Sequence, residues 1–441
     1  VAARAEGQVR FLSFLYSNCL DNRVFSWYDL NHTMSVQCTH KIRLQPNNQQ
    51  ANHLRQACGV ARFAYNWGLG EWQRQYEAGE KPSPYALKKQ FNSIKREQFD
   101  FVTKCAAEQA FTDLGKAFGN FFRNVKAGRP PGYPRFKRRG IRDSFYVDNI
   151  QLKLKNKRVR IPKLGWVKMA EPLRLQGKIT SAVISCTAGR WFCSIQVEID
   201  IPDVKAVGPT VGVDVGIKRL AVTSDGRVFQ NPRALRTAEK RTRLLQKAVS
   251  RKPKGSRNRA KAIQRLQRHH YHIACIRADA IHKATTAITK GVGRIVLEDL
   301  NIAGMMRNRR LAKALQDASL SELHRQITYK AEQLGIEIIW ADRFYPSSKT
   351  CSGCGSVKAV LTLGERQYRC EACGLKIDRD LNAALNLKQL AAGSAVTACC
   401  LGSSGVSMVR HETTDWAGIS HEKISVRRKE QGTIVWVAMG T

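Results

Sequence analysis

The periodic patterns of the chain begin with an alternation of apolar and polar positions just after residue 34. Alternate residues fall on one face, as in a half-buried β-strand: Val36, Cys38, His40, Ile42 and Leu44. Residues 48–126 then place apolar side chains at helical spacing, and residues 144–200 return to short β-rich runs. These patterns predict a helical block between an opening strand and a small antiparallel barrel or sheet, which that strand can join.

The second half of the chain has an α/β pattern. An apolar strand at 210–215 is followed by Gly216 and a second apolar strand that ends at a turn, Asp225-Gly226. Another buried-type strand covers residues 294–298, and the Ala and Leu spacing of residues 381–387 predicts a helix. The predicted fold class is therefore α/β, with several domains.

Acidic residues occupy unusual places in these elements. Asp214 lies in the middle of an apolar strand, where burial of its charge is costly unless a cation neutralises it. Glu298 ends the later strand, and Asp378 and Asp380 lie where the last helix begins. Each acid alone has an ordinary alternative, namely a turn residue, a strand end or a residue that favours the helix dipole. Together, carboxylates from separate elements can converge on Mg²⁺, which prefers oxygen ligands.

The cysteines predict a second metal site. Thirteen cysteines are present, and four of them form two Cys-x-x-Cys pairs: Cys351, Cys354, Cys370 and Cys373. Fifteen residues separate the pairs, a spacing typical of a structural zinc ribbon in a reducing compartment. A redox pair or a coincidence is the alternative. Four thiolate ligands leave no open position on the zinc, so its role would be structural.

The net charge of the chain restricts the class of function most strongly. The 441 residues contain 74 Lys and Arg against 35 Asp and Glu, which gives +39 and excludes an ordinary neutral metabolic enzyme. Such charge repels itself unless a polyanion such as nucleic acid neutralises it. Two segments, 123–142 and 236–270, are strongly basic, and the second predicts two helices joined at a Pro/Gly break. A solvated charged face is the alternative for each. The candidate nucleic-acid contacts are Arg135, Lys137, Arg138, Arg139, Lys252, Lys254, Arg257 and Arg259.

The remaining segments predict little chemistry. Residues 1–33 contain three basic and three acidic residues, and we expect a neutral extension that is not native to the protein, with a genuine neutral extension as the alternative. Residues 393–441 lack a sustained period, and we expect a poorly ordered tail. No apolar run approaches the length of a membrane span, which predicts a soluble protein of the prokaryotic cytoplasm that joins the nucleoid when bound to DNA.

Several motifs together resemble the TnpB (OrfB) family of transposon-encoded RNA-guided nucleases, which are similar to compact type V CRISPR effectors. The resemblance covers about residues 34–392. The motifs are FAYNWGLGEW, GRPPGYPRFKRRGIRDSF, VGVDVGIKRLAVTSDG, RKPKGSRNRAKA, RIVLEDLNIAGMMRN, RFYPSSKTCSGCG, CEACG and DRDLNAALNL.

This resemblance implies a domain plan around a RuvC-like nuclease of RNase H fold. The implied domains are a β-barrel wedge domain (34–46 and 144–203), a helical recognition domain (47–143), the nuclease (204–345 and 377–392) with basic helices at 234–290, and an inserted zinc ribbon with four cysteine ligands (346–376). Asp214, Glu298 and Asp380 match the catalytic acids of the family. Asp378 and Asp299 then become supporting residues around them.

The resemblance also implies cofactors and partners. These are structural Zn²⁺, catalytic Mg²⁺ (two ions, with Mn²⁺ as a substitute), a guide RNA (omega RNA) and target double-stranded DNA beside a short transposon-adjacent motif, cleaved in both strands. One or two copies of the protein per RNA are both compatible with the family. Two alternatives stay open on the residues, namely an RNA-guided or plain DNA-binding regulator that does not cleave, and a strand-transferring transposase.

Overall fold

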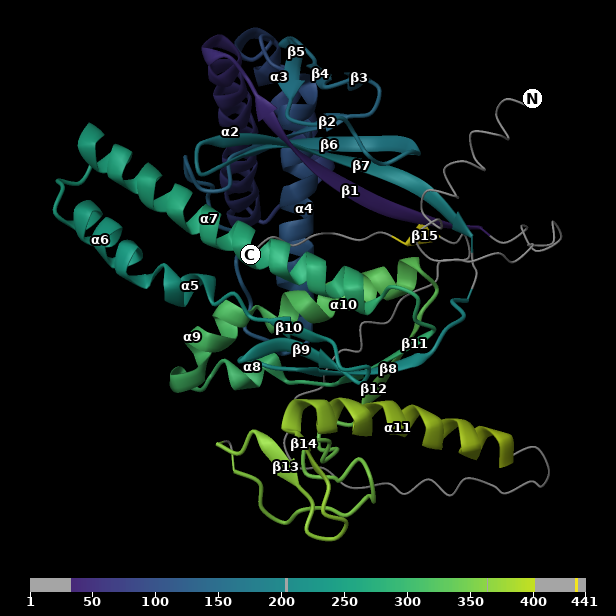
Figure 1. Cartoon of the computed structure of the whole chain (residues 1–441). Coiled ribbons are helices and arrows are strands. Elements are labelled where there is room, and N and C mark those ends of the chain that lie inside the picture. Colours follow the sequence, from purple (N-terminus) through teal and green to yellow (C-terminus); the bar gives the residue numbers. More distant parts are fainter. Residues whose placement is uncertain (1–32, 203–204, 363, 401–432, 435–441) are drawn as a thin grey trace. The chain divides into compact units, whose positions relative to one another are not determined.

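The computed structural model describes residues 33–202, 205–362, 364–400 and 433–434. It divides into two compact units, one built from residues 33–201 and the other from residues 202–400. The fold is mixed α/β, as expected (Figure 1). The extension at 1–32 and most of the expected tail lie outside the described residues. Within that tail, the last helix continues to Cys400, eight residues beyond the expected end of the nuclease domain at 392.

An eight-stranded sheet forms one half of the first unit. The opening strand lies inside this sheet, between β7 and β5, so distant segments of the chain share one sheet. Its residues Val36, Ile42 and Leu44 are buried, as the alternation predicted. The path is β2-β6-β7-β1-β5-β4-β3, with β15 paired to β1. The bounds are β1 Thr33–Gln45, β2 Ser144–Asp148, β3 Lys153–Lys155, β4 Arg158–Ile161, β5 Gly165–Met169, β6 Lys178–Thr187, β7 Arg190–Pro202 and β15 Thr433–Ile434.

Three helices complete the first unit: α2 Asn48–Glu77, α3 Pro84–Gln98 and α4 Lys104–Lys126. The side chains of Asn47 and Gln50 form a reciprocal capping box at the start of α2, which satisfies backbone N–H groups that have no partner within the helix. The rings of Trp72 and Phe118 stack 4.0 Å apart between α2 and α4. Such aromatic pairs pack the helices together, and buried apolar side chains of the helices and of the sheet form one core.

The second unit contains a five-stranded sheet in the order β10-β9-β8-β11-β12. Strands β10, β9 and β8 are antiparallel neighbours, whereas β11 and β12 run parallel to β8. The strand bounds are β8 Thr210–Val215, β9 Arg219–Thr223, β10 Val228–Gln230, β11 Arg294–Glu298 and β12 Glu337–Ala341. The helices are α5 Ala234–Thr237, α6 Glu239–Ser250, α7 Arg257–Ile288, α8 Ile302–Met305, α9 Arg309–Ala318, α10 Leu320–Gln333 and α11 Arg379–Cys400.

Helices cover both faces of this sheet (Figure 1). Val211 and Val213 of β8 face α7 and α10, where Ile281 and Leu323 are buried. On the other face, Val296 and Leu387 belong to the small core beneath α11. A pair of short strands, β13 Gln367–Arg369 and β14 Lys376–Asp378, precedes α11. None of the described helices combines the length and the apolar character that crossing a membrane requires.

Candidate active site and metal centre

Two neighbouring parallel strands carry the first two acids. Val213 of β8 pairs with Leu297 of β11, so the next step in this register sets Asp214 beside Glu298. Side chains alternate along a strand, and therefore Asp214 projects from the same face as Gly212. That face is the one covered by α11.

Gly212 determines how closely α11 approaches this face. A Cβ atom at residue 212 would lie 2.1 Å from the carbonyl oxygen of Ala384 and 2.6 Å from the amide nitrogen of Lys388. Only glycine permits this backbone contact. Asp380 precedes Ala384 by four residues, about 6 Å along a helix, and Asp214 follows Gly212 by two residues, about 6.6 Å along a strand. The contact at Gly212 therefore brings Asp380 level with Asp214.

The three carboxylates influence one another. Burial raises the pKa of Asp214 well above its usual range, and the negative charges of Glu298 and Asp380 raise it further, while Arg379 opposes this. Asp214 and Asp380 also line one small cavity of about 70 Å³. A pKa raised by burial and by like charges is typical of carboxylates gathered for metal binding, because a cation relieves both causes.

Arg219 holds the start of α11. Its Nη1 donates to Asp378 Oδ1 at 2.8 Å and lies 3.4 Å from Asp380 Oδ2. Asp378 also accepts from the backbone N–H groups of Asp380 and Leu381, so it caps the helix. Although partial burial opposes it, the bond from Arg219 lowers the pKa of Asp378. Asp378 thus holds the first turn of α11, which carries Asp380, and its expected role around the metal stays a prediction.

Ser347 is a site residue that sequence reasoning missed. It is buried, and its hydroxyl donates to Glu298 Oε1. The amide of Asn386, fully buried in α11, donates to the carbonyl oxygens of Ser347 and Thr350 at 2.7 Å each. Asn382, one turn earlier, also donates to Thr350 O. The only available signal was the polar pair Asn382 and Asn386 at helical spacing on an otherwise apolar face of α11.

Asp299 lies differently from the other acids. Its side chain forms an ion pair with Arg343 at 2.6 Å and is 56% exposed. Within the described residues, its side chain is joined to Arg343, and its backbone N–H donates to the carbonyl oxygen of Ala341. None of these contacts reaches Asp214, Glu298 or Asp380. The role expected for Asp299 around the other three acids stays a prediction.

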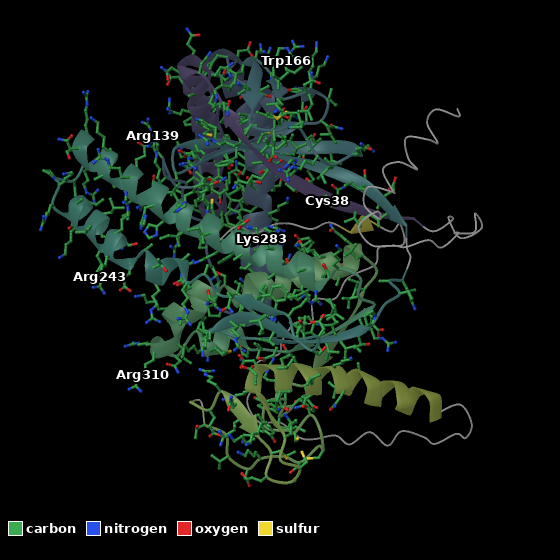
Figure 2. The ribbon with its side chains drawn as sticks, in the orientation of Figure 1. Cys38, Arg139, Trp166, Arg243, Lys283 and Arg310 are labelled. Atoms are coloured by element: carbon green, nitrogen blue, oxygen red, sulfur yellow. The ribbon has the colours of Figure 1, made fainter. Side chains whose placement is uncertain are left out.

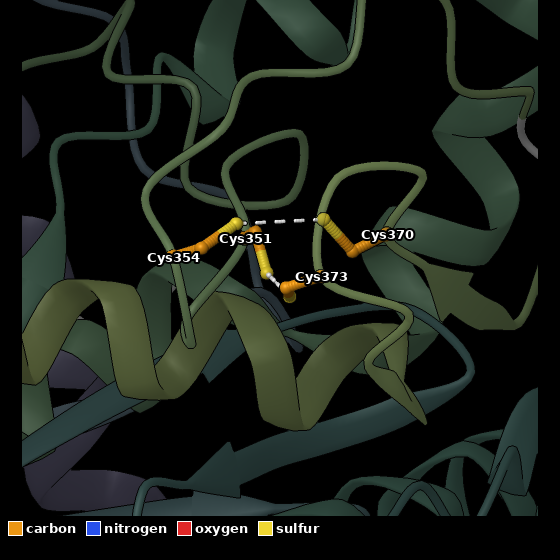
Figure 3. A group of neighbouring side chains, drawn as sticks. All are labelled: Cys351, Cys354, Cys370 and Cys373. Carbon is orange, nitrogen blue, oxygen red and sulfur yellow. Dashed lines mark hydrogen bonds between the residues drawn. The ribbon is translucent and has the colours of Figure 1, made fainter.

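The four cysteines form a compact cluster (Figure 3). Their sulfur atoms all lie within 4.8 Å of one another, with Cys351 and Cys373 at 3.6 Å and Cys354 and Cys370 at 3.5 Å. Zn–S bonds of about 2.3 Å in a tetrahedron separate sulfur atoms by about 3.8 Å, so this set fits zinc. Backbone N–H groups, first that of Cys373, lower the pKa of the Cys370 thiol to about 6. The backbone N–H of Ser356 lowers the pKa of the Cys354 thiol, but hydrogen bonds within the cluster raise it to about 12. The geometry of the four sulfur atoms, and not these shifts, is therefore what supports a zinc site.

The carboxylates are arranged more loosely than the cysteines. Among the described residues, the four cysteines are the only group of three or more potential ligands whose donor atoms all lie within 4.8 Å of one another. The chemistry of the carboxylate set nevertheless fits a hard divalent cation, because all its donors are oxygens.

The basic segments differ in how free their side chains are. Lys137 lies over the Tyr65 ring at 4.1 Å and forms an ion pair with Asp113, so its ammonium group is already engaged within the first unit. Lys254 and Arg257 are exposed in and after the link between α6 and α7. Figure 2 shows many nitrogen-tipped side chains along these two helices. Among the labelled ones, Arg243 pairs with Glu239 and Lys283 pairs with Asp279.

Comparison with known proteins places these features in a family. A family model described as "Probable transposase" matches residues 194–309, one described as "Cas12f1-like, TNB domain" matches residues 321–387, and one described as "Helix-turn-helix domain" matches residues 34–81. In this chain the last of these segments holds strand β1 and helix α2.

Relatives extend the match to most of the chain. "Putative RNA-guided DNA endonuclease InsQ" of Escherichia coli strain K12 is 34% identical over 81% of this chain and 93% of the relative. A "Putative RNA-guided DNA endonuclease" of Streptomyces pristinaespiralis is also 34% identical, over 81% and 90%. "CRISPR-associated endodeoxyribonuclease Cas12f1" of Sulfoacidibacillus thermotolerans is 26% identical over 45% and 50%. The chain therefore belongs to the TnpB (OrfB, IS605-type) family, as its motifs predicted.

Proposed function

We propose that the chain is a metal-dependent RNA-guided DNA endonuclease of a transposable element. The observation that carries the proposal is the approach of Asp214, Glu298 and Asp380 from β8, β11 and α11, with a raised Asp214 pKa. The relatives that match over most of their length carry the name RNA-guided DNA endonuclease. The strand order β10-β9-β8-β11-β12 supports a RuvC-like domain of RNase H fold.

Each residue of the site has a distinct task in this proposal. Asp214, Glu298 and Asp380 would hold two Mg²⁺ ions, with Mn²⁺ as a substitute. Bound there, such ions would supply activation of water and stabilisation of the leaving oxygen of a phosphodiester. Arg219 holds Asp380 in place through its ion pairs. Ser347 fixes Glu298 by its hydrogen bond, and Asn386 in turn fixes Ser347.

The other parts of the chain take the nucleic acids. A guide RNA pairs with the target strand and provides most of the specificity, while the protein recognises the duplex shape and a short adjacent motif. We assign the wedge role to the eight-stranded sheet of the first unit and the recognition role to α2, α3 and α4. The total charge of +39 suits the two polyanions.

The decisive experiment is the loss of one metal-binding carboxylate. Protein purified with its co-expressed RNA is incubated with Mg²⁺ and a plasmid library that carries the guide-matched target beside randomised flanks. We expect the wild type to cleave beside one flank, and Asp214→Ala to cleave at least about 10³-fold more slowly. Asp279→Ala is the control and should cleave at the wild-type rate. Asp279 is an exposed acid that, in the described part of the chain, pairs only with Lys283.

The products separate the alternatives. Hydrolysed ends support the endonuclease, whereas joined strands indicate a transposase. Specific target binding without cleavage by the wild type indicates a regulator, and undiminished cleavage by Asp214→Ala contradicts the proposed site.

We also propose that the cysteine cluster holds one structural Zn²⁺. Because the ligand bonds contribute directly to folding, Cys354→Ser should lose the zinc and lower the melting temperature of the second unit. Cys275→Ser is the matched control, since Cys275 is exposed and lies outside the cluster. Metal content by mass spectrometry and thermal melting measure both effects; a wild-type protein without zinc that melts like Cys354→Ser argues against the site.

A further inference from the structure

A second, larger cavity lies beside the carboxylates in the second unit. Its volume is about 470 Å³, within the range of cavities that hold nucleotide-sized ligands. Cationic side chains dominate its wall: Lys218, Arg233, Arg236, Arg310, Lys313 and Arg366. They come from the β8–β9 turn, from residues before and within α5, from α9 and from the segment before β13.

The two acids in the wall are already engaged. Asp317 is buried, forms an ion pair with Arg277 at 3.0 Å and accepts from the backbone N–H groups of Leu235 and Arg236. Glu239 pairs with Arg243 at 2.6 Å and with Lys313 at 2.8 Å. These acids therefore hold the wall together and do not neutralise the remaining cations.

The other cations of the wall are left for a ligand. Among the residues that the structure describes, no ion pair involves the side chain of Lys218, Arg233, Arg236, Arg310 or Arg366. Five such charges around one cavity repel each other, and an anion would relieve that repulsion. Guanidinium groups suit phosphate in particular, because their N–H groups match its oxygens.

The rim of the cavity is held in place. Asn231 donates from Nδ2 to the carbonyl oxygen of Ile217 at 2.7 Å, and its Oδ1 accepts from the N–H of Arg233 at 3.0 Å. Arg233 itself has φ 47° and ψ 43°, a left-handed conformation that few residues other than glycine adopt. The position of this arginine backbone is thus set before any ligand arrives, which lowers the entropic cost of binding.

The cavity adjoins the small cavity of the carboxylates, because the two share lining residues. Ile217, Lys218 and Arg366 line both, and Asp214 and Asp380 line the smaller one. A ligand in the larger cavity therefore lies next to the bond that the carboxylates would cleave. The phosphates nearest to a phosphodiester under attack are those of the same strand.

We propose that this cavity binds backbone phosphates of the DNA strand being cut, next to the scissile bond. The inference rests on the proposed nuclease function and adds positioning residues to it. Arg236 of α5 and Arg310 of α9 both line the cavity and hold the strand there, while Lys218 and Arg366 line this cavity and the small one.

The test compares two neighbouring arginines of α9. Arg310 lines the cavity and Arg309 does not, although both begin the same helix and both are exposed (Arg310 is labelled in Figure 2). We expect Arg310→Gln and Arg236→Gln to slow single-turnover cleavage by about tenfold each, the loss of one charge-assisted hydrogen bond. Arg309→Gln should stay within about twofold of the wild type. Guide-RNA retention and target binding should be unchanged, because the contacts are to the strand at the site.

A second measurement is independent of cleavage. In the Asp214→Ala background, binding of a short single-stranded oligodeoxynucleotide is measured over a range of salt concentrations. Each phosphate that the protein no longer neutralises reduces the slope of log K against log salt by about 0.7. We expect this reduction for Arg310→Gln and for Arg236→Gln, but not for Arg309→Gln.

The outcomes separate this inference from the proposed function. If the wild type does not cleave, the proposed nuclease function is wrong. The salt dependence of oligonucleotide binding then still shows whether the cavity binds a DNA strand. If Arg310→Gln equals Arg309→Gln in both measurements, the cavity does not bind the strand. If Arg310→Gln releases the guide RNA instead, the cavity binds RNA and the proposal is wrong.

Discussion

At the scale of single residues, the site depends on an aspartate in an unfavourable place. Asp214 lies in an apolar strand beside Glu298 and Asp380, and burial is the main cause of its raised pKa. A folded protein that lacks a bound cation carries this cost without compensation. The proposed metal binding and stability therefore oppose each other at this residue.

This opposition predicts a pH-dependent stability. A raised carboxyl pKa means that the folded chain binds the proton more tightly than the unfolded chain, so stability falls as pH rises through the raised value. Asparagine does not ionise, so a variant with asparagine at residue 214 does not lose stability in this way. In chelator-treated protein at about pH 8, we expect Asp214→Asn to have a higher melting temperature than the wild type. The increase should be about 2–4 °C for each kcal/mol by which the substitution raises the free energy of unfolding.

The difference in melting temperature should shrink as the pH falls toward the ordinary carboxyl range, where the wild type is protonated too. Asp279→Asn, at an exposed residue that is 62% accessible, should change the melting temperature little at any pH. A lower melting temperature for Asp214→Asn than for the wild type under alkaline conditions would count against the pKa shift.

At the scale of elements, the contact between β8 and α11 decides whether the acids meet. The polar residues Asn382 and Asn386 of α11 hold the segment around Ser347, and Gly212 admits the helix backbone to the sheet. One helix thus organises both Asp380 and, through Ser347, Glu298. Buried amides that satisfy carbonyl groups are costly to remove, about 1–3 kcal/mol each.

Gly212→Ala tests this contact. The added Cβ meets the Ala384 carbonyl at 2.1 Å, and backbone cannot yield as a side chain can. We expect a loss of about 1–3 kcal/mol in the free energy of unfolding, together with a large loss of cleavage. Gly119→Ala in α4 is the control, because nothing lies within 4 Å of its added Cβ, and it should be neutral or stabilising. Equal stability of Gly212→Ala and the wild type would refute the close contact.

At the scale of the whole molecule, the net charge of +39 is the dominant property. It predicts steep salt dependence of guide-RNA binding, because each neutralised phosphate releases counterions. The net charge does not say which cations contact the RNA. Every cation contributes to the net charge, but only cations that contact phosphates contribute to the slope of log K against log salt concentration.

Two quadruple variants of equal charge separate these effects. Replacing Lys252, Lys254, Arg257 and Arg259 by Gln should reduce the salt slope by about 0.7–0.9 for each side chain that contacts a phosphate. Replacing Arg74, Lys283, Arg294 and Arg325, which are all paired with acids, lowers the charge equally, from +39 to 39 − 4 = +35. Filter binding at several salt concentrations measures both; equal slopes would show that net charge alone governs binding.

Most elements could be predicted because local patterns determine them. The alternation of β1, the periods of α2 and α4 and the strand around Asp214 all appear in the structure where the sequence indicated. Arg219 and Ser347 were missed as site residues. Their side chains reach acids 159 and 49 positions away along the chain, and no local pattern encodes contacts over such separations.

The sequence alone determined the family, the zinc-type cysteine spacing and the excess of positive charge, and it predicted which acids form the site, since each depends on residue type and order along the chain. Only the tertiary structure decided that Asp299 pairs with Arg343 and that Lys137 is engaged with Tyr65 and Asp113. It also decided that, in the part of the chain that the structure describes, five cations without an acidic partner surround a cavity beside the carboxylates. The reason is physical: charge and packing act through distance in space, and distance in space is set by how β8, α9 and α11 pack and not by their separation in sequence.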